Sequence, residues 1–96
     1  MRRFPSDVRA QVGYELFRVQ QGLEPSDWKP RSSVGAGVIE LRVHTGQAFR
    51  VMYVTRFSEA IYVLHAFEKR TRRTSQVDIA VGRKRLRDLI QWRNRQ

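Results

Sequence analysis

The residues of this sequence with the clearest chemical potential are its arginines and lysines. The 96-residue chain carries 19 Lys and Arg against nine Asp and Glu, so its formal net charge is +10 at pH 7. Only Lys29, Lys69 and Lys84 are lysines, and arginine binds phosphate in a bidentate manner and stacks on bases. A folded domain with this charge needs an anionic partner. The composition therefore predicts binding to a polyanion, above all RNA, rather than a soluble surface with a basic bias.

The cations are concentrated toward the end of the chain. Ten of them lie in the last 28 residues: Lys69, Arg70, Arg72, Arg73, Arg83, Lys84, Arg85, Arg87, Arg93 and Arg95. Beside a tyrosine or a histidine, such cations can cleave RNA without a metal. The 2′-hydroxyl attacks its own phosphate, the cations neutralise the growing charge, and a base and an acid move protons. A basic helix alone is more often a binding face, so the cluster that begins at Lys69 is what favours catalysis.

Other kinds of site find little support in the sequence. No glycine-rich phosphate-binding motif is present, and His44 and His65 are the only histidines, with no HExxH motif. The absence of cysteine excludes disulfides, thiolate catalysis and cysteine-type zinc sites. The paired carboxylates of a glycosidase follow no visible spacing. We therefore expect neither a metal nor a cofactor.

The length and hydropathy pattern indicate one domain away from the membrane. A chain of 96 residues with 41% apolar residues can build a single modest core, and no repeat or linker divides residues 1–96. The longest apolar stretch, Ala60–Leu64, is far shorter than the roughly 20 residues that span a bilayer. No apolar signal-peptide region follows the first three residues. A reducing cytoplasm suits such a chain.

The elements that must position the cations begin with a helix. Ser6 follows Pro5 and is a candidate N-cap, and the apolar spacing that follows predicts a helix near Ser6–Gln21. Residues 24–37 contain several Pro, Gly and Ser residues and are expected to form a loop. Trp28, inside that loop, is interpreted as an apolar anchor in preference to a base-stacking residue.

Three strands and a second helix complete the predicted fold. Alternating apolar residues predict strands at Val38–Val43, Ala48–Thr55 and Ala60–Phe67, joined by short turns into an antiparallel meander. Ser75 and Asp78 form a capping box that opens a helix near Gln76–Arg93. The expected fold class is α+β, with both helices on one face of a three-stranded sheet. Five residues are expected in its core: Ile39, Leu41, Val51, Leu86 and Leu89. Arg42 and Arg50 can join the other cations if they point to the face that the helices leave uncovered.

Three segments carry a resemblance to a known family. They are Phe49–Tyr53 (FRVMY), Ile61–Phe67 (IYVLHAF) and Lys69–Thr74 (KRTRRT). They resemble the phage-derived, HigB-like branch of the RelE/ParE toxins, in which an FRVxY strand, an LLHxFxKKTxKT segment and a terminal basic helix are typical. Residues 22–30 and 34–42 also look like family signatures, so the resemblance covers nearly the whole chain.

The resemblance implies the toxin of a bacterial, cytoplasmic type II toxin–antitoxin module. Many members cleave mRNA on the translating ribosome, without a metal, and so inhibit translation. The partner implied is a small antitoxin, here with a helix-turn-helix DNA-binding domain. Two alternatives remain: a non-catalytic RNA- or ribosome-binding protein, and a toxin of the same superfamily that acts on DNA gyrase. Because one fold hosts all three functions, fold cannot decide between them.

The resemblance also implies roles for particular residues. The catalytic candidates are Arg50, Lys69, Arg72, Tyr53 and His65. Among the RNA-binding candidates, the resemblance implies Arg70 and Arg73, and the distribution of charge adds Arg42, Arg83, Lys84 and Arg87. Tyr53 and His65 are acid or base candidates, although strand alternation could equally turn both inward. For His65, a core histidine bonded to a backbone carbonyl is the favoured alternative.

One departure from the family concerns the start of the chain. Such toxins usually begin with an edge strand before the first helix, whereas this sequence starts almost at that helix. Either the true start lies upstream or the sheet has lost an edge strand. An uncovered edge invites pairing with another chain, so a homo-oligomer is a further expectation. A smaller departure is Arg72, where the family commonly has a neutral polar residue.

Overall fold

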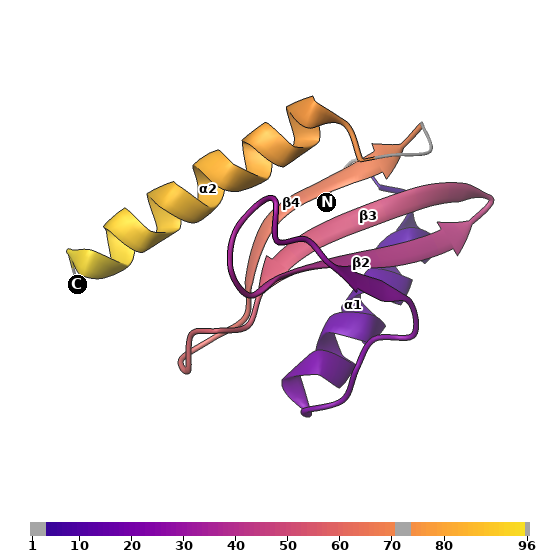
Figure 1. The fold of residues 1–96 in the computed structure, drawn as a ribbon. Helices are drawn as coiled ribbons and strands as arrows, with labels where there is room; N and C mark the ends of the chain where they lie inside the picture. Colours follow the sequence, from indigo (N-terminus) through magenta and orange to yellow (C-terminus); the bar gives the residue numbers. More distant parts are fainter. Residues whose placement is uncertain (1–3, 71–73, 96) are drawn as a thin grey trace.

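The computed structural model describes residues 4–70 and 74–95 of the chain. Within these ranges, two helices and four strands form a fold of the α+β class, and the sequence predicted this class (Figure 1). In chain order, the elements are α1 (Ser6–Gln20), β1 (Trp28–Pro30), β2 (Val38–Thr45), β3 (Gln47–Val54), β4 (Tyr62–Lys69) and α2 (Gln76–Asn94). None of the helices in these ranges is both long enough and apolar enough to cross a membrane.

The sheet has four antiparallel strands rather than the three expected. Its order is β1-β2-β3-β4, and the added strand β1 pairs with β2 through Trp28 opposite Leu41 and Pro30 opposite Ile39. A proline lacks the N–H that a central strand needs, but it is tolerated at an edge. Because residues 24–37 contain several prolines and glycines, the sequence predicted a loop and missed this short strand. Trp28 lies in the strand and is half-buried.

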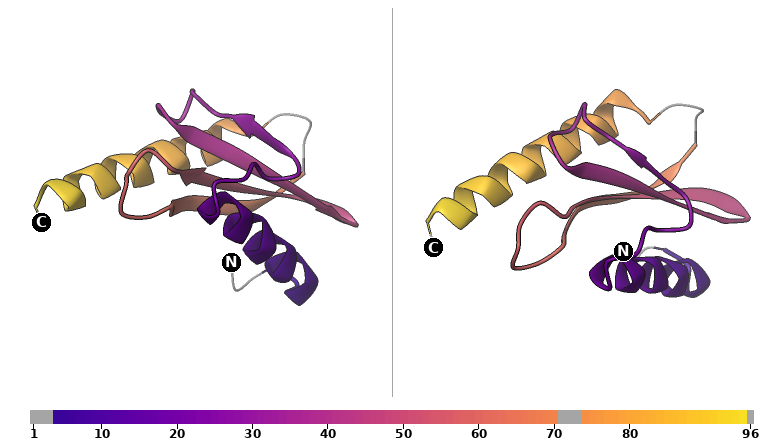
Figure 2. Two further views of the ribbon diagram at one scale, coloured as in Figure 1. Left: turned by 90° about the horizontal axis from the view of Figure 1, so that it is seen from below. Right: turned by 60° about the horizontal axis from the view of Figure 1, so that its bottom comes forward.

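The two helices cover opposite faces of the sheet, so the expectation that they share one face is wrong. Figure 2 shows the sheet between α1 and α2. The core beneath α1 contains Val8, Val12, Leu41, Val43, Phe49, Val51 and Tyr53. The core beneath α2 contains Val34, Val38, Met52, Val54, Leu64, Phe67, Ile79 and Leu86. The physical reason lies in β3, whose residues 49–54 are all buried, which requires cover on both faces.

Most of the residues expected in the core are buried. Leu41, Val51 and Leu86 are buried, whereas Ile39 and Leu89 are half-buried. The approach of α2 to the sheet is close at Gly82, where a Cβ atom would lie 2.9 Å from the sulfur of Met52. A side chain at this position would therefore push the helix away from the sheet.

The predicted start of α2 is confirmed, and that of α1 differs in its cap. The hydroxyl of Ser75 accepts a hydrogen bond from the backbone N–H of Asp78 at 3.1 Å, as a capping box requires. Helix α1 begins at Ser6 itself, its N-cap is Pro5, and no side chain caps it. Hydrogen bonding at its first turn instead comes from Asp7, whose carboxylate accepts from the N–H of Val8 at 2.9 Å.

We expect Leu86→Ala to lower the free energy of unfolding by about 2–4 kcal/mol, because the substitution leaves a cavity between α2 and the sheet. Val77→Ala is the matched control, since Val77 lies on the same helix with 73% of its surface exposed. Urea denaturation followed by circular dichroism compares the two variants. Equal, small effects would show that α2 is not packed as described.

Candidate polyanion-binding site

Strand register brings cations from three strands together. Arg42 on β2 lies opposite Arg50 on β3, and Arg50 lies opposite Phe67 on β4. Lys69 is two residues beyond Phe67 and so shares its face of the sheet. This face also carries α2, and the cations lie beyond its apolar part, toward the β2–β3 turn. The sequence allowed Arg42 and Arg50 to join the other cations from a face without a helix, and the structure places both on the face that carries α2.

A fully buried carboxylate lies at the centre of these cations. The Oε2 atom of Glu40 is 2.8 Å from Nε of Arg31, and its Oε1 atom is 3.2 Å from Nε of Arg50. The hydroxyl of Thr74, just before α2, donates to Oε2 at 2.9 Å. The side chain of Glu40 has no exposed surface. Glu40 therefore connects the segment after β1, strand β3 and the start of α2 through one charge.

Sequence reasoning missed Glu40 and Arg31 as parts of this site. Glu40 alternates with Ile39 and Leu41 in a way that is typical of a strand with one solvated face. The signal that would have revealed it is its partners, which lie 9, 10 and 34 positions away in the sequence. We call Arg31, Arg42, Arg50 and Lys69, which surround Glu40, the cation cluster.

Arg50 is held firmly and is largely covered. Its Nη1 group donates to the backbone carbonyl of Phe49 at 3.1 Å, and its side chain is 6% exposed. Its contact with Glu40 is an ion pair without hydrogen-bond geometry, because the buried Nε–H of Arg50 has no hydrogen-bond partner among the described residues. The side chain of Arg42 is more accessible, at 27% exposed. An anion arriving from solvent would therefore meet Arg42 and the half-buried Lys69 before Arg50.

Electrostatic coupling joins the cluster into one unit. Burial lowers the pKa of Lys69 below its ordinary value, and Arg50 lowers it further, while Glu40 partly opposes this. Burial also lowers the pKa of Arg50, and the charge of Glu40 opposes that shift. Arg42 lowers both pKa values. Four cations thus crowd around one buried carboxylate, and a bound anion would relieve their mutual repulsion.

A weaker acidic contact borders the cluster at Asp27. Its Oδ1 atom is 3.9 Å from Nη1 of Arg42, and its Oδ2 atom is 3.3 Å from Nε2 of His44. Asp27 and His44 are 45% and 60% exposed, so solvent screens this contact strongly. The cluster therefore keeps an excess of positive charge.

His65 lies on the α2 face, near the start of α2. Its Nε2 atom is 2.8 Å from Oδ1 of Asp78, and the hydroxyl of Ser75 donates to the other carboxylate oxygen of Asp78 at 2.7 Å. Its ring stacks on Phe67, with centroids 4.8 Å apart and planes at 22°. His65 was expected to bond to a backbone carbonyl, and its partner is instead the carboxylate of Asp78. Such a partner orients the ring and selects which nitrogen carries the proton.

Tyr53 is not brought together with the cation cluster. It lies on the α1 face of β3, is 1% exposed, and belongs to the core beneath α1. Burial raises its pKa to about 12, and the charge of Glu15 on α1 adds to this shift. A phenol in this position is neutral at physiological pH and has no access to a ligand on the other face.

The remaining candidates lie outside the cluster. Arg70 is 82% exposed, 3.7 Å from the carboxylate of Glu68. Arg83 donates to the carbonyl of Ser33 at 2.5 Å, Lys84 pairs with Asp88 at 2.8 Å, and Arg87 is exposed on α2. Arg72 and Arg73 lie outside the described residues. The helix cations thus form an outer surface along α2 rather than an extension of the cluster.

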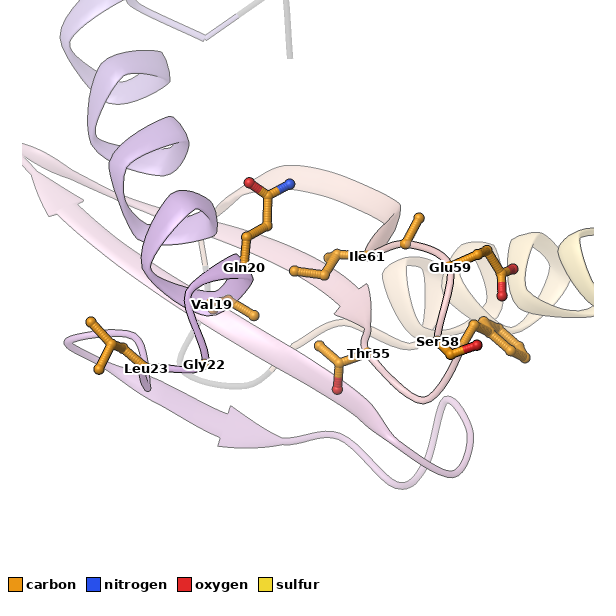
Figure 3. A pocket seen from close by; sticks show the side chains of 10 residues that line it. Val19, Gln20, Gly22, Leu23, Thr55, Ser58, Glu59 and Ile61 are labelled. Atoms are coloured by element: carbon orange, nitrogen blue, oxygen red, sulfur yellow. The ribbon is translucent and has the colours of Figure 1, made fainter.

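A separate open hollow of about 540 Å³ lies between the end of α1 and the β3–β4 connection (Figure 3). Val19, Leu23, Thr55 and Ile61 line it, and none of its described lining residues is a cation. It therefore lacks the groups that would bind a phosphate. Among residues 4–70 and 74–95, no three His, Asp or Glu residues gather in a way that could hold a metal ion.

We expect Glu40→Gln to destabilise the fold by about 3–5 kcal/mol, because Arg31 and Arg50 would lose their buried counter-charge. Asp88→Asn is the control, because it breaks the exposed pair with Lys84 and should change stability little. The free energies of unfolding of both variants, from urea titration, test this. If the Glu40→Gln protein were as stable as the Asp88→Asn protein, the buried charge of Glu40 would not be needed for the fold.

The sequence of this chain matches a known protein family. Residues 1–87 match the model of the family described as Phage derived protein Gp49-like (DUF891). No curated protein and no solved structure matches the chain significantly. The matched range includes all three segments that carried the resemblance and the whole cation cluster. The chain therefore belongs to the phage-derived Gp49-like family, one of the RelE/HigB-like toxin families in the broad sense.

Proposed function

We propose that this protein is the toxin of a type II toxin–antitoxin module and that it cleaves mRNA on the ribosome. The observation that carries the proposal is the cation cluster around Glu40. It concentrates phosphate-binding groups from three strands on one face of the sheet, and a fixed set of cations suits the charge of a phosphate in its transition state. Family membership supports the toxin class, and the excess of positive charge supports an RNA substrate.

The proposed chemistry is transesterification within the RNA. The 2′-oxygen forms a bond to the adjacent phosphorus while the bond to the 5′-oxygen breaks, which leaves a 2′,3′-cyclic phosphate and a 5′-hydroxyl. Lys69 and Arg42 neutralise the phosphate, with Arg50 behind them. His65, oriented by Asp78, is the proposed proton carrier, because a histidine whose ring is held by a carboxylate can act as a general acid or base.

The burial of Arg50 favours a second candidate function, an RNA- or ribosome-binding protein without chemistry. The side chain of Arg50 is 6% exposed and pairs with Glu40, so it stabilises the fold whether or not a ligand is bound. The tyrosine that was expected to act as an acid or base is also absent from the cluster, because Tyr53 lies on the other face of the sheet. In this reading the same cations hold RNA, and no bond is broken.

The proposed partner is an antitoxin with an acidic segment that covers the cation cluster. Its acidic side chains would replace the phosphate charges and so block the site. The outer edge of β4 offers a further point of contact, because β4 is an edge strand of the described sheet. Arg85 already donates to the carbonyl of Leu64 on this strand at 3.0 Å, which leaves a shorter free edge for a partner or a second copy.

We expect Lys69→Ala to lower mRNA cleavage by on the order of 100-fold, as loss of a transition-state cation does. Lys69 is a better target than Arg50, because Arg50→Ala would also leave the buried carboxylate of Glu40 with one cation fewer and so disturb the fold. Lys69→Arg should restore part of the activity, and Arg9→Ala, which removes an exposed cation of α1 on the other face of the sheet, should change it little. Mapping of mRNA 5′ ends after induction measures cleavage.

The same experiment separates the candidate functions. Cuts confined to translated regions support the ribosome-dependent endonuclease. Growth arrest without cuts, or DNA damage in place of cuts, would favour the binding protein or a gyrase-directed toxin. Full cleavage by a folded Lys69→Ala protein would remove the cluster from the mechanism.

We expect the protein to co-purify with the product of a neighbouring gene, with an affinity that falls as salt rises, because the contact is largely ionic. Charge reversal by Lys69→Glu should weaken this complex more than tenfold, whereas Arg9→Glu on α1, away from the cluster, should not. Isothermal titration at two salt concentrations measures both. Absence of a complex at micromolar concentration and low salt would contradict the proposed partner.

A further inference from the structure

The end of α2 carries an aromatic surface that none of the proposed roles uses. Trp92 has 50% of its surface exposed, although an exposed tryptophan leaves a large apolar area in water. The C-terminal end of α2 extends beyond the sheet (Figure 1). There Trp92 and Arg93 border a hollow of about 320 Å³, together with Glu59 and Tyr62.

The hollow is built from side chains that hold one another in place. Arg93 binds the carboxylate of Glu59 in a bidentate manner, with Nε 2.6 Å from Oε2 and Nη2 2.9 Å from Oε1. The hydroxyl of Tyr62 donates to Oε2 of Glu59 at 2.9 Å. The guanidinium of Arg93 lies 3.8 Å from the ring centroid of Phe57, and that ring meets Tyr62 edge to face at 5.9 Å. The β3–β4 connection and the last turns of α2 therefore form one preorganised surface.

The chemistry of the hollow selects a planar base rather than a phosphate. The hydrogen bonds that Arg93 donates to Glu59 lower the pKa of Glu59 to about 2. This carboxylate is therefore ionised and repels phosphate. Oε1 of Glu59 receives one hydrogen bond and keeps room for a second, such as one from a base N–H group. Exposed tryptophan provides the flat apolar surface on which bases stack, with little dependence on sequence.

Cations on α2 and in the β3–β4 connection supply the complementary charge for the RNA backbone. Arg87 and Arg95 are exposed and form no ion pair with a described residue, and Arg56 stacks beside Phe57 at 5.0 Å. Helix α2 has 19 residues and is therefore about 28 Å long. It starts near Thr74 at the cation cluster, carries Trp92 in its last turn, and has cations along its outer surface. One RNA strand could follow this path.

We propose that Trp92, with Tyr62 and Glu59, forms a base-stacking subsite for single-stranded RNA whose backbone is held at the cation cluster. This inference rests on the proposed function, because it assumes that the cluster binds RNA. Trp92 lies beyond residue 87, where the match to the family model ends. The stacking residue of the subsite therefore lies outside the matched range, whereas Glu59 and Tyr62 lie within it.

Fluorescence tests the subsite directly. Trp28 is the only other tryptophan, so a Trp28→Phe background reports on Trp92 alone. We expect a single-stranded RNA of ten mixed nucleotides to quench this fluorescence. Trp92→Ala should lower RNA affinity about tenfold, as loss of one stacked base does, while Trp92→Phe should keep most of it. Phe17→Ala is the matched control, since Phe17 is an aromatic residue with 57% exposure on the other helix.

Heparin, a polyanion without bases, separates stacking from charge. Trp92→Ala should leave heparin affinity unchanged, and an equal loss for heparin and RNA would overturn the subsite. Unchanged RNA affinity, with weakened binding of the antitoxin, would assign Trp92 to a protein interface and also overturn it. Lys69→Ala is measured in parallel. If Lys69→Ala weakens RNA binding and Trp92→Ala does not, only the proposed subsite is contradicted. If the unsubstituted protein does not bind RNA, both the subsite and the proposed function are contradicted.

Discussion

The buried charge of Glu40 is the constraint on which the rest of the structure depends. A carboxylate without exposed surface persists in a fold only when cations and hydrogen-bond donors surround it. Arg31, Arg50 and Thr74 supply them from three separate segments. The same contacts place Arg50 and Arg31 on the face where a phosphate would bind, so the stability of the fold and the arrangement of the site have one cause.

Strand β3 divides the molecule into two faces with different tasks. Its residues on one face, including Val51 and Tyr53, complete the core beneath α1. Those on the other face include Met52 beneath α2 and Arg50 in the cation cluster. The α1 face is therefore apolar and structural, whereas the α2 face combines an apolar half with a charged half. This division explains why a buried phenol and a buried guanidinium can follow each other closely in the sequence.

Local patterns in the sequence predicted most of the elements, and contacts between distant segments accounted for what was missed. The Ser75–Asp78 capping box and the alternation of β2, β3 and β4 depend on neighbouring residues, so they could be recognised. The side of the sheet on which each helix packs depends on the burial of β3 on both faces, which alternation alone does not reveal. Strand β1 was hidden because Pro30 is typical of a loop, and Glu40 because its partners are far away in the sequence. The burial of Arg50 was missed for the same reason, because it depends on Glu40 and on the cover that other segments provide.

The double burial of β3 also limits how the chain can change in length. Side chains alternate along a strand, so one inserted residue reverses the face of every residue beyond it. An insertion before Arg50 would turn this charge into the apolar core beneath α1 and Tyr53 toward the cations. Additions and losses are therefore better tolerated in the connections between the elements than within β3, except where a connection carries a contact such as that of Arg31 with Glu40. The length of the central strand is the stricter limit on how variants of this protein can differ.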